Sequence, residues 1–243
     1  MRRRWSPNVD DRPPGCAIDA LILHYTGMPS AGAALERLCD PAAKVSAHYL
    51  IDEDGSVTQL VAEARRAWHA GVSSWAGRPR LNDCAIGIEL VNPGHEWGYR
   101  RFTEAQYAAC IALCRAILGR WPIPPQRVLA HSDVAPERKQ DPGELFDWGR
   151  LATAGIGLWP RAGEGRARPL ARVLEELARI GYPIPHSGRN DQPTRRVIAA
   201  FQRHFRPARV DGVADRETLA RLDGLLASLL TLETAGGRGD IYE

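Results

Sequence analysis

Three short apolar runs, each ending on or containing a residue that can do chemistry, constrain the fold of this chain most. The first run ends on His24 and the third on His131, while Glu89 lies in the middle of the second, residues 85–91. Runs of this length, bounded by turn-forming residues, are typical of buried strands. We therefore expect an α/β protein in which both histidines close strands, at the edge where such folds commonly place chemistry.

Residues 131–143 bring an imidazole, two carboxylates and an ammonium into one segment: His131, Asp133, Lys139 and Asp141. Two prolines and a glycine predict a rigid loop instead of a helix. Imidazole nitrogen and carboxylate oxygen both suit Zn²⁺, and a catalytic zinc needs only three protein ligands, so the loop is a candidate metal site. Taken alone, however, the segment fits a solvated loop with an incidental histidine better, and its spacing does not choose between the two carboxylates.

Lys139 is unusual because the chain uses arginine almost everywhere else. Of its 32 basic residues, only Lys44 and Lys139 are lysines. An ammonium is compact and can direct a single charge at a developing oxyanion, which a planar guanidinium does differently. The composition therefore indicates a specific role for Lys139.

His24 and Glu89 each have a structural and a functional interpretation. A buried histidine is commonly satisfied by a backbone carbonyl, but His24 closes a strand as His131 does and is followed by Gly27. A carboxylate is expensive to bury unpaired, so Glu89 must meet a cation or face a solvated cleft. If the two histidines lie near Glu89, a metal or a water is its natural partner.

Residues 67–77 are rich in glycine and aromatic residues without periodicity, which predicts a loop lining the cleft. Trp68 and Trp75 of this loop can either stack on a sugar or pack in the core, and packing is the default. The surrounding elements are predicted from their start and turn signals: a helix at 31–39 capped by Ser30, a hairpin at 48–61 and a helix at 103–119.

The composition divides the chain into a large domain and a small one. Residues 155–167 are rich in glycine, alanine, proline and arginine, which marks a linker, and three helical patterns follow in a module of about 60 residues. The expected divisions are an irregular lead-in at 1–16, the main domain at 17–154, the linker at 155–167, a three-helix domain at 168–232 and a disordered tail at 233–243.

Charge and hydropathy argue against two classes of protein. The net charge of +3 is too small to indicate a nucleic-acid partner, and no apolar run approaches the ~20 residues that a membrane span needs. The basic excess lies in residues 161–243, as expected of a solvated surface or of a module that meets an acidic polymer. Because the basic start is followed by two aspartates and no apolar segment, we expect a cytoplasmic protein whose five cysteines are reduced.

Five segments follow one another in an order that goes beyond arguments from spacing. They are LILHYT at 21–26, SAHYLIDEDG at 46–55, RAWHAG at 66–71, NDCAIGIE at 82–89, and HSD with KQDPG within 131–143. Together they resemble the zinc N-acetylmuramoyl-L-alanine amidases of the type 2 amidase family, which is related to the peptidoglycan recognition proteins. Residues 199–202 and 210–215 look like parts of the three-helix peptidoglycan-binding module often appended to such enzymes, although these motifs are shorter.

The resemblance implies a central mixed β-sheet flanked by helices, together with a small C-terminal three-helix domain and a set of site residues. It makes Zn²⁺ the cofactor, with His24, His131 and Asp141 as its ligands, and gives Asp133 no ligand role. It makes Glu89 the general base and Lys139 the partner of the oxyanion, and Trp68 and His69 are further candidates for substrate contact.

One departure from part of the family bears on the mechanism. Some phage-type relatives have a tyrosine and a cysteine at the positions where this chain has Ala47 and Asp141. The difference favours the branch that relies on Glu89 and argues against an amidase of the phage lysozyme type.

The implied reaction is hydrolysis of the amide between the lactyl group of N-acetylmuramic acid and L-alanine in a muropeptide. The expected cytoplasmic location favours 1,6-anhydro-muropeptides from peptidoglycan recycling, whereas the C-terminal module favours intact peptidoglycan in the periplasm or envelope. A non-catalytic peptidoglycan recognition protein is a third alternative, although such proteins typically lack a complete set of metal ligands. The sequence indicates no particular oligomeric state.

Overall fold

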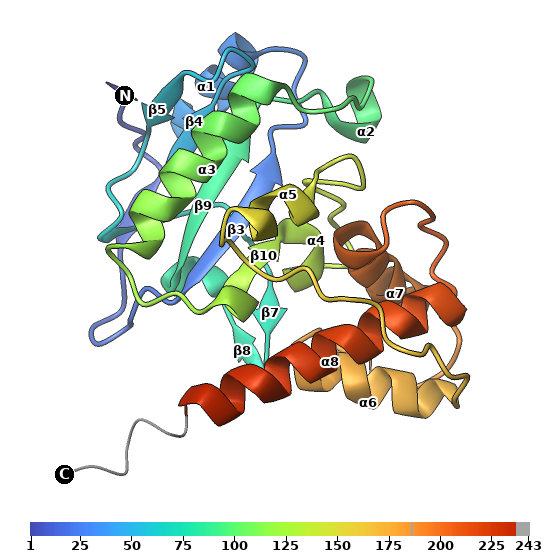
Figure 1. Cartoon of the computed structure of the whole chain (residues 1–243). Helices are drawn as coiled ribbons and strands as arrows, with labels where there is room; N and C mark the ends of the chain where they lie inside the picture. Colours follow the sequence, from blue (N-terminus) through green and yellow to red (C-terminus); the bar gives the residue numbers. More distant parts are fainter. Residues whose placement is uncertain (186, 237–243) are drawn as a thin grey trace, which may run out of the picture.

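A computed structural model describes residues 1–185 and 187–236, which form a sheet-based domain followed by a helical module (Figure 1). The strands are β1 (Arg2–Arg3), β2 (Val9–Asp11), β3 (Ala20–Tyr25), β4 (Tyr49–Ile51), β5 (Val57–Gln59), β6 (Arg65–Ala67), β7 (Ser74–Trp75), β8 (Arg78–Pro79), β9 (Ala85–Leu90) and β10 (Val128–Ala130). The helices are α1 (Ala31–Cys39), α2 (Gly94–Trp97), α3 (Glu104–Leu118), α4 (His131–Val134), α5 (Trp148–Thr153), α6 (Leu170–Ile180), α7 (Gln192–Phe205) and α8 (Arg216–Gly236). Short 3₁₀ turns lie at Pro41–Ala43, Leu81–Asp83 and Pro125–Arg127.

Six strands form one mixed sheet in the order β1-β5-β4-β9-β3-β10. Its neighbouring strands are parallel except for β4 and β5, which form the predicted antiparallel hairpin. Two small ribbons pair β2 with β6 and β7 with β8. The mixed sheet flanked by helices confirms the expected fold class, and its register places His24 of β3 directly beside Glu89 of β9.

The two faces of the sheet are covered differently, because alternate residues of a strand point to opposite sides. On one face, Leu23 and its neighbours pack against α3, which lies across the sheet in Figure 1. On the opposite face, Ile22 packs with residues of the helical module and Leu50 packs against α1. By alternation His24 and Glu89 also belong to this second face, so the candidate site lies between these two coverings.

Start signals in the sequence predicted α1 and α3 correctly. The Ser30 side chain accepts a hydrogen bond from Ala33 N at the first turn of α1. Thr103 and Gln106 form a reciprocal capping box at the start of α3. Because each cap satisfies backbone N–H groups that have no partner within the helix, the position where each helix begins is set locally.

The lead-in that the sequence predicted to be irregular is partly strand. β1 extends the large sheet beside β5, and β2 pairs with β6. Arg12 then enters the protein and donates hydrogen bonds to four backbone carbonyls, those of Glu63, Asn82, Asp83 and Ala85. A guanidinium has five donors in a fixed plane, so one side chain ties several distant segments together. The proline-rich composition gave no sign of this contact.

The sequence predicted a loop throughout residues 131–143, but the first four residues form the single helical turn α4. Pro136 lies beyond this turn, where its missing N–H takes nothing from the helix. Residues 135–143 contain neither helix nor strand, as predicted.

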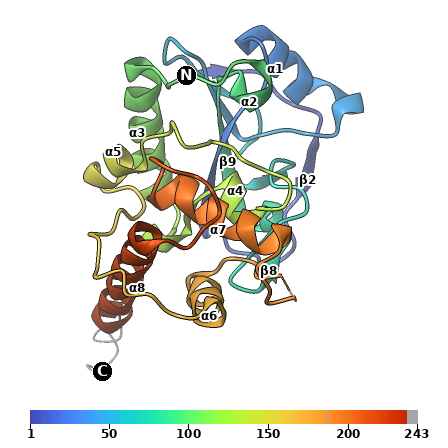
Figure 2. The ribbon, with the colours of Figure 1, turned by 90° about the vertical axis from the view of Figure 1, so that its right-hand side faces the viewer.

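α6, α7 and α8 form the expected helical module, but their apolar residues do not make a separate core. Leu174, Phe201 and Leu222 belong to one buried cluster with Ile22 and Leu129 of the sheet. Figures 1 and 2 both place α7 against α4. A module near the lower size limit for independent folding is therefore stabilised by burying part of its surface against the larger domain.

The expected linker is a packed segment without helix or strand, which we call the strap (residues 156–169). It runs along α8, where Gly163 N donates a hydrogen bond to Ala220 O at 2.7 Å. A Cβ on Gly224 would overlap the Arg161 carbonyl, so the glycine lets the two segments come this close. The strap is therefore held to the module along its length.

The C-terminal tail begins later than expected, because α8 continues to Gly236 whereas we predicted disorder from Glu233. The rest of the predicted tail, residues 237–243, lies outside the described residues. Among the helices that the structure describes, none has the length and apolar character needed to cross a membrane.

Candidate active site

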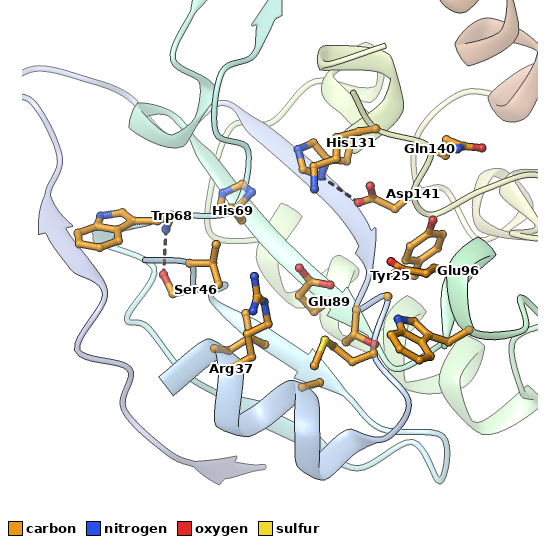
Figure 3. Close-up of a pocket in the computed structure, with 18 of the residues that line it drawn as sticks. Tyr25, Arg37, Ser46, Trp68, His69, Glu89, Glu96, His131, Gln140 and Asp141 are labelled. Carbon is orange, nitrogen blue, oxygen red and sulfur yellow. Dashed lines mark hydrogen bonds and ion pairs between the residues drawn. The ribbon is translucent and has the colours of Figure 1, made fainter. Parts of the chain in front are cut away.

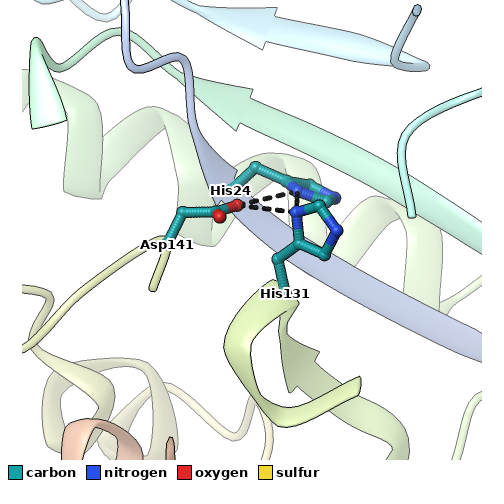
Figure 4. Close-up of side chains that lie close together, drawn as sticks. All are labelled: His24, His131 and Asp141. Carbon is teal, nitrogen blue, oxygen red and sulfur yellow. Dashed lines mark hydrogen bonds and ion pairs between the residues drawn. The ribbon is translucent and has the colours of Figure 1, made fainter. Parts of the chain in front are cut away.

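Two strand ends and one loop bring His24, His131 and Asp141 together on the second face of the sheet (Figure 4). His24 lies near the end of β3, His131 follows β10, and Asp141 lies in the non-helical part of residues 131–143. The Nδ1 atoms of the two imidazoles are 2.9 Å apart. Asp141 Oδ2 lies 3.0 Å from His24 Nδ1 and 2.9 Å from His131 Nδ1, and all three side chains are buried.

The second nitrogen of each ring has its own partner, which orients the first. His131 Nε2 lies 3.1 Å from Ala70 O and must donate to it, so Nδ1 is the ring nitrogen left to bind a metal. His24 Nε2 lies 3.1 Å from His69 Nδ1. Burial lowers the pKa of His24 to about 4, so this ring is neutral at pH 7. With its proton on Nε2, it presents Nδ1 as a lone pair.

Asp141 completes a set of three acceptor atoms. Burial alone would raise the pKa of the Asp141 carboxyl, but positive charge and N–H donors on His131 and His24 hold this pKa well below its usual range, so the carboxyl is ionised when a cation, either a ring proton or a metal, lies beside it. Three acceptors within 3.0 Å of one another repel unless a cation lies between them. Two imidazole nitrogens and one carboxylate oxygen are the donor set of a three-ligand zinc site, so the residues fit that metal.

A cavity of about 550 Å³ opens beside this cluster, and Glu89 points into it (Figure 3). Glu89 Oε2 is buried and receives no hydrogen bond from the part of the chain that the structure describes. Burial, and next the charge of Asp141, raise the pKa of the Glu89 carboxyl well above its usual range. A carboxyl in such surroundings can both accept a proton and return it, as a general acid and base must.

Two neighbouring cations line the side of the cavity formed by residues 131–143. The Lys139 side chain is partly buried and borders both this cavity and an adjoining one of about 330 Å³. Arg138 instead donates from Nε to Val72 O at 2.9 Å and from Nη2 to Ala70 O. It thereby fixes the carbonyl that accepts the His131 proton, a function that the sequence did not suggest for one arginine among many.

Trp68 and His69 lie side by side on the cavity wall. The Trp68 indole donates a hydrogen bond to Asp10 Oδ2 at 2.7 Å, which orients the ring. The His69 ring fits against β9 because residue 87 is glycine, and a Cβ on Gly87 would overlap the ring. Trp75 is 3% exposed and packs in the shared core, as its default interpretation predicted.

Asp133, whose role the spacing left open, is engaged away from the metal-ligand cluster. Its Oδ1 accepts a hydrogen bond from Tyr182 OH at 2.7 Å. Its Oδ2 lies 2.7 Å from His204 Nδ1 and accepts from Ala130 N at 2.8 Å. The carboxylate is fully buried and has three donors, two of them from the helical module.

The cavity is also lined by residues that sequence reasoning did not single out, among them Tyr25, Arg37, Glu96 and Trp97. Tyr25 follows His24 directly, so its position at the strand end was a usable signal. Trp97 lies in the short helix α2 and is 56% exposed. An exposed tryptophan becomes informative only when the structure shows that it borders a cavity.

The arrangement combines a cation site, a carboxyl that can exchange protons and an ammonium around one cavity. These are the elements that hydrolysis of a carbonyl substrate requires: activation of water, proton transfer and stabilisation of an oxyanion.

Two protein families match this chain. Residues 14–144 match the family model described as N-acetylmuramoyl-L-alanine amidase. Residues 171–222 match a putative peptidoglycan binding domain. The first match spans more than half of the chain and includes all the cavity residues discussed above, while the second lies in the helical module.

Curated relatives agree with the family matches. N-acetylmuramoyl-L-alanine amidase AmiD of Escherichia coli (strain K12) is 44% identical over 232 residues, covering 86% of this chain and 82% of AmiD. The 1,6-anhydro-N-acetylmuramyl-L-alanine amidase AmpD of the same organism is 39% identical over 167 residues, covering 62% of this chain and 89% of AmpD.

Solved structures share the fold over most of the chain. AmiD from E. coli in complex with the substrate anhydro-N-acetylmuramic acid-L-Ala-D-gamma-Glu-L-Lys has a TM-score of 0.78 at 40% identity, covering 89% of this chain and 92% of that chain. AmpDh3 from Pseudomonas aeruginosa in complex with anhydromuramic pentapeptide has a TM-score of 0.82 at 34% identity, with coverages of 93% and 98%.

Proposed function

The chain belongs to the N-acetylmuramoyl-L-alanine amidase family, and on that premise we propose that it is a zinc hydrolase of muropeptides. It cleaves the amide between the lactyl group of N-acetylmuramic acid and L-alanine, with 1,6-anhydro-muropeptides as the preferred substrates. The observation that carries this proposal is the convergence of His24, His131 and Asp141 beside the cavity that contains Glu89. We assign catalysis to residues 17–154 and contact with peptidoglycan to residues 168–232.

In this proposal His24 and His131 hold Zn²⁺ through Nδ1 and Asp141 holds it through a carboxylate oxygen. When bound, zinc supplies Lewis acidity and lowers the pKa of a water molecule to about 7. The contacts of His131 with Ala70 and of His24 with His69 fix both rings with Nδ1 toward the metal site. Trp68 and His69 contact the substrate on the same wall.

Glu89 and Lys139 carry out the remaining chemistry. Glu89 accepts the proton of the attacking water at a carboxylate oxygen and then returns it to the nitrogen of the departing L-alanine, which leaves as a neutral amine. Its raised pKa supports the second transfer, because the protonated form is stabilised by the buried site. Lys139 directs its ammonium toward the scissile carbonyl oxygen, where negative charge develops.

The choice of substrate rests on the relatives. AmiD and AmpDh3 were solved with anhydromuramyl peptides, and AmpD is named for the 1,6-anhydro sugar. A second candidate is an envelope amidase that acts on intact peptidoglycan, and the match of the helical module to a putative peptidoglycan binding domain favours it.

The experiment is mass spectrometry of the products formed by purified enzyme with a measured zinc content. Soluble anhydro-muropeptides and intact sacculi are offered side by side. Release of free peptide from the soluble substrate alone supports the recycling function, together with the cytoplasmic location expected from the sequence. Release from sacculi at a similar rate supports the envelope enzyme, and zinc-loaded protein that cleaves neither substrate contradicts the proposed activity.

A further inference from the structure

We infer that the helical module is a positioning element of the metal site: His204 and Tyr182 hold Asp133, and Asp133 holds the turn that carries His131. The inference rests on the proposed zinc site. It gives the module a second role, besides contact with peptidoglycan, that does not depend on the substrate.

The Asp133 carboxylate is the centre of this arrangement. It is fully buried, and its three donors come from different parts of the chain: Ala130 N precedes it, Tyr182 follows α6, and His204 lies at the end of α7. All three distances are between 2.7 and 2.8 Å. Hydrogen bonds to a buried carboxylate are among the stronger ones in proteins, and they fix its position.

The turn that Asp133 stabilises is too short to hold itself. α4 has only four residues, and a single helical turn forms few internal hydrogen bonds. The Asp133 carboxylate bonds to Ala130 N, the backbone group just before His131, so it sets how the chain leaves β10. Ser132 N donates to Asp141 O at 3.0 Å, which links the same turn to the backbone of another metal ligand.

α7 also contacts the loop farther along, on the way to Asp141. Arg196 Nη1 donates to Glu137 O at 3.0 Å, and Arg203 Nη2 donates to Gln140 Oε1 at 3.1 Å. The helix therefore contacts the ligand-bearing segment at Asp133, two residues after His131, and again next to Asp141. The position of these ligands depends on where α7 lies.

His204 and Tyr182 are positioning residues in this view, because they act on zinc only through Asp133. Residues that orient metal ligands typically contribute a factor of ~10–100 to metal affinity. These two residues act one contact farther from the metal, so we expect the lower end of that range.

Gln202 provides a matched control on the same helix. It is fully buried, and within the described part of the chain its side chain bonds only to the module, to groups of Asp211, Gly212, Val213 and Thr218. Gln202→Ala therefore removes a buried polar network of comparable size without touching Asp133.

The test compares full-length His204→Ala, His204→Asn, Tyr182→Phe and Gln202→Ala with the unchanged protein. The rate of zinc release to a chromophoric chelator is measured for each. The visible absorption spectrum of the cobalt-substituted protein reports the ligand geometry, and thermal unfolding shows that every variant is folded at the assay temperature.

We expect His204→Ala to weaken zinc binding about tenfold, which is seen as faster zinc release, and to alter the cobalt spectrum. Tyr182→Phe should weaken zinc binding by less. Asparagine places an amide donor where histidine has Nδ1, so His204→Asn should restore most of both properties. Gln202→Ala should lower the unfolding temperature but leave zinc release and the cobalt spectrum unchanged.

Zinc release and cobalt spectra that are unchanged in folded His204→Ala and Tyr182→Phe would overturn the inference. So would an equal effect of Gln202→Ala, because the module would then act only through general stability. If His204→Ala does not fold, Tyr182→Phe still decides the question. None of these readouts requires cleavage of a muropeptide, so failure of the proposed activity would be seen separately.

Discussion

Two buried clusters of imidazole and carboxylate lie on either side of the turn α4, and they differ in their balance of donors and acceptors. In the metal-site cluster, His24, His131 and Asp141 turn acceptor atoms toward one another. In the module cluster, the Asp133 carboxylate is met by three donors, two of which belong to Tyr182 and His204. The same types of side chain thus make a site that needs a cation and a site that is already complete.

The comparison shows what distinguishes a functional cluster from a structural one. Both are buried, both contain histidine and aspartate, and both draw on residues from the segment 131–143. Only in the first do three possible metal-ligand atoms face one another, and only the first borders the large cavity. Each of the following predictions tests one side of this difference.

The largest effect should come from the unpaired carboxyl beside the metal-site cluster. Glu89→Gln keeps the size of the side chain but removes its ability to exchange a proton, so we expect turnover to fall by ~10²–10⁴-fold. The measurement is the initial rate of peptide release by folded, zinc-loaded protein. Near-normal turnover would show that Glu89 is not the general base.

Acid should destabilise the metal-free protein through the buried imidazoles. The pKa of His24 is about 4 in the folded protein against 6.5 for an ordinary histidine, so the unfolded chain binds the proton more tightly. Stability from this group is complete above about pH 6.5 and is lost as the pH falls toward 4. The loss is on the order of 3 kcal/mol for His24 alone.

Two further effects enter the same measurement. Burial lowers the pKa of His48 to about 3 and that of His69 well below its usual value, which adds to the loss. The raised pKa of Glu89 acts in the opposite direction, because its stabilising contribution is lost as the pH rises. Denaturant unfolding of the metal-free protein at pH 7 and pH 4.5 measures the sum, and equal stability at both values would contradict the prediction.

Removing one carboxylate from each cluster should change zinc affinity and unfolding free energy in different proportions. Asp141→Asn takes a charged ligand from the metal site, and we expect zinc affinity to fall by about 100-fold with little loss of stability in the metal-free protein. Asp133→Asn leaves donors of the module cluster without a full acceptor, so it should cost ~1–3 kcal/mol of unfolding free energy, while zinc binding weakens only about tenfold through the turn that carries His131. Chelator competition measures the zinc affinity of each variant, and denaturant unfolding measures the unfolding free energy of each. Indistinguishable profiles would mean that the two clusters do not differ in kind.

The smallest effect should come from the glycine that makes room for the His69 ring. Gly87→Ala places a Cβ where the ring packs, so His69 must shift away from His24 Nε2. We expect about tenfold weaker zinc binding, because the orienting partner of a ligand is displaced. His69→Ala is the matched comparison, and Gly87→Ala should add little to it. If the double variant Gly87→Ala/His69→Ala lost zinc affinity by the full sum of the two single effects, Gly87→Ala would act through another part of β9 and not through His69.

The sequence predicted the parts of the fold and site that depend on local pattern. Short apolar runs identified β3, β9 and β10, and strand ends identified His24 and His131. Spacing could not choose between Asp133 and Asp141, because both lie in one segment and the choice depends on which side of α4 each side chain faces.

Contacts between distant segments could not be predicted in this way. Tyr182 lies 49 residues from Asp133 in sequence and His204 lies 71 residues away, so nothing in the local pattern of either signals the contact. The contacts of Arg12 could not be predicted for the same reason. Its acceptors are backbone carbonyls, which every residue has, so no residue type in the sequence indicates them. The strap was predicted to be a linker because glycine and proline are common both in flexible linkers and in packed segments without helix or strand.

The strap also determines how the protein can use a polymer that its module holds. A flexible linker would let the cavity search a volume around the attachment point, with an effective concentration set by the linker length. Here the strap lies along α8 and the module shares its core with the sheet, so the separation between module and cavity is fixed. On a regular polymer the enzyme would therefore cut at one fixed distance from the place where the module is bound. A fragment too short to span that distance would gain nothing from the module.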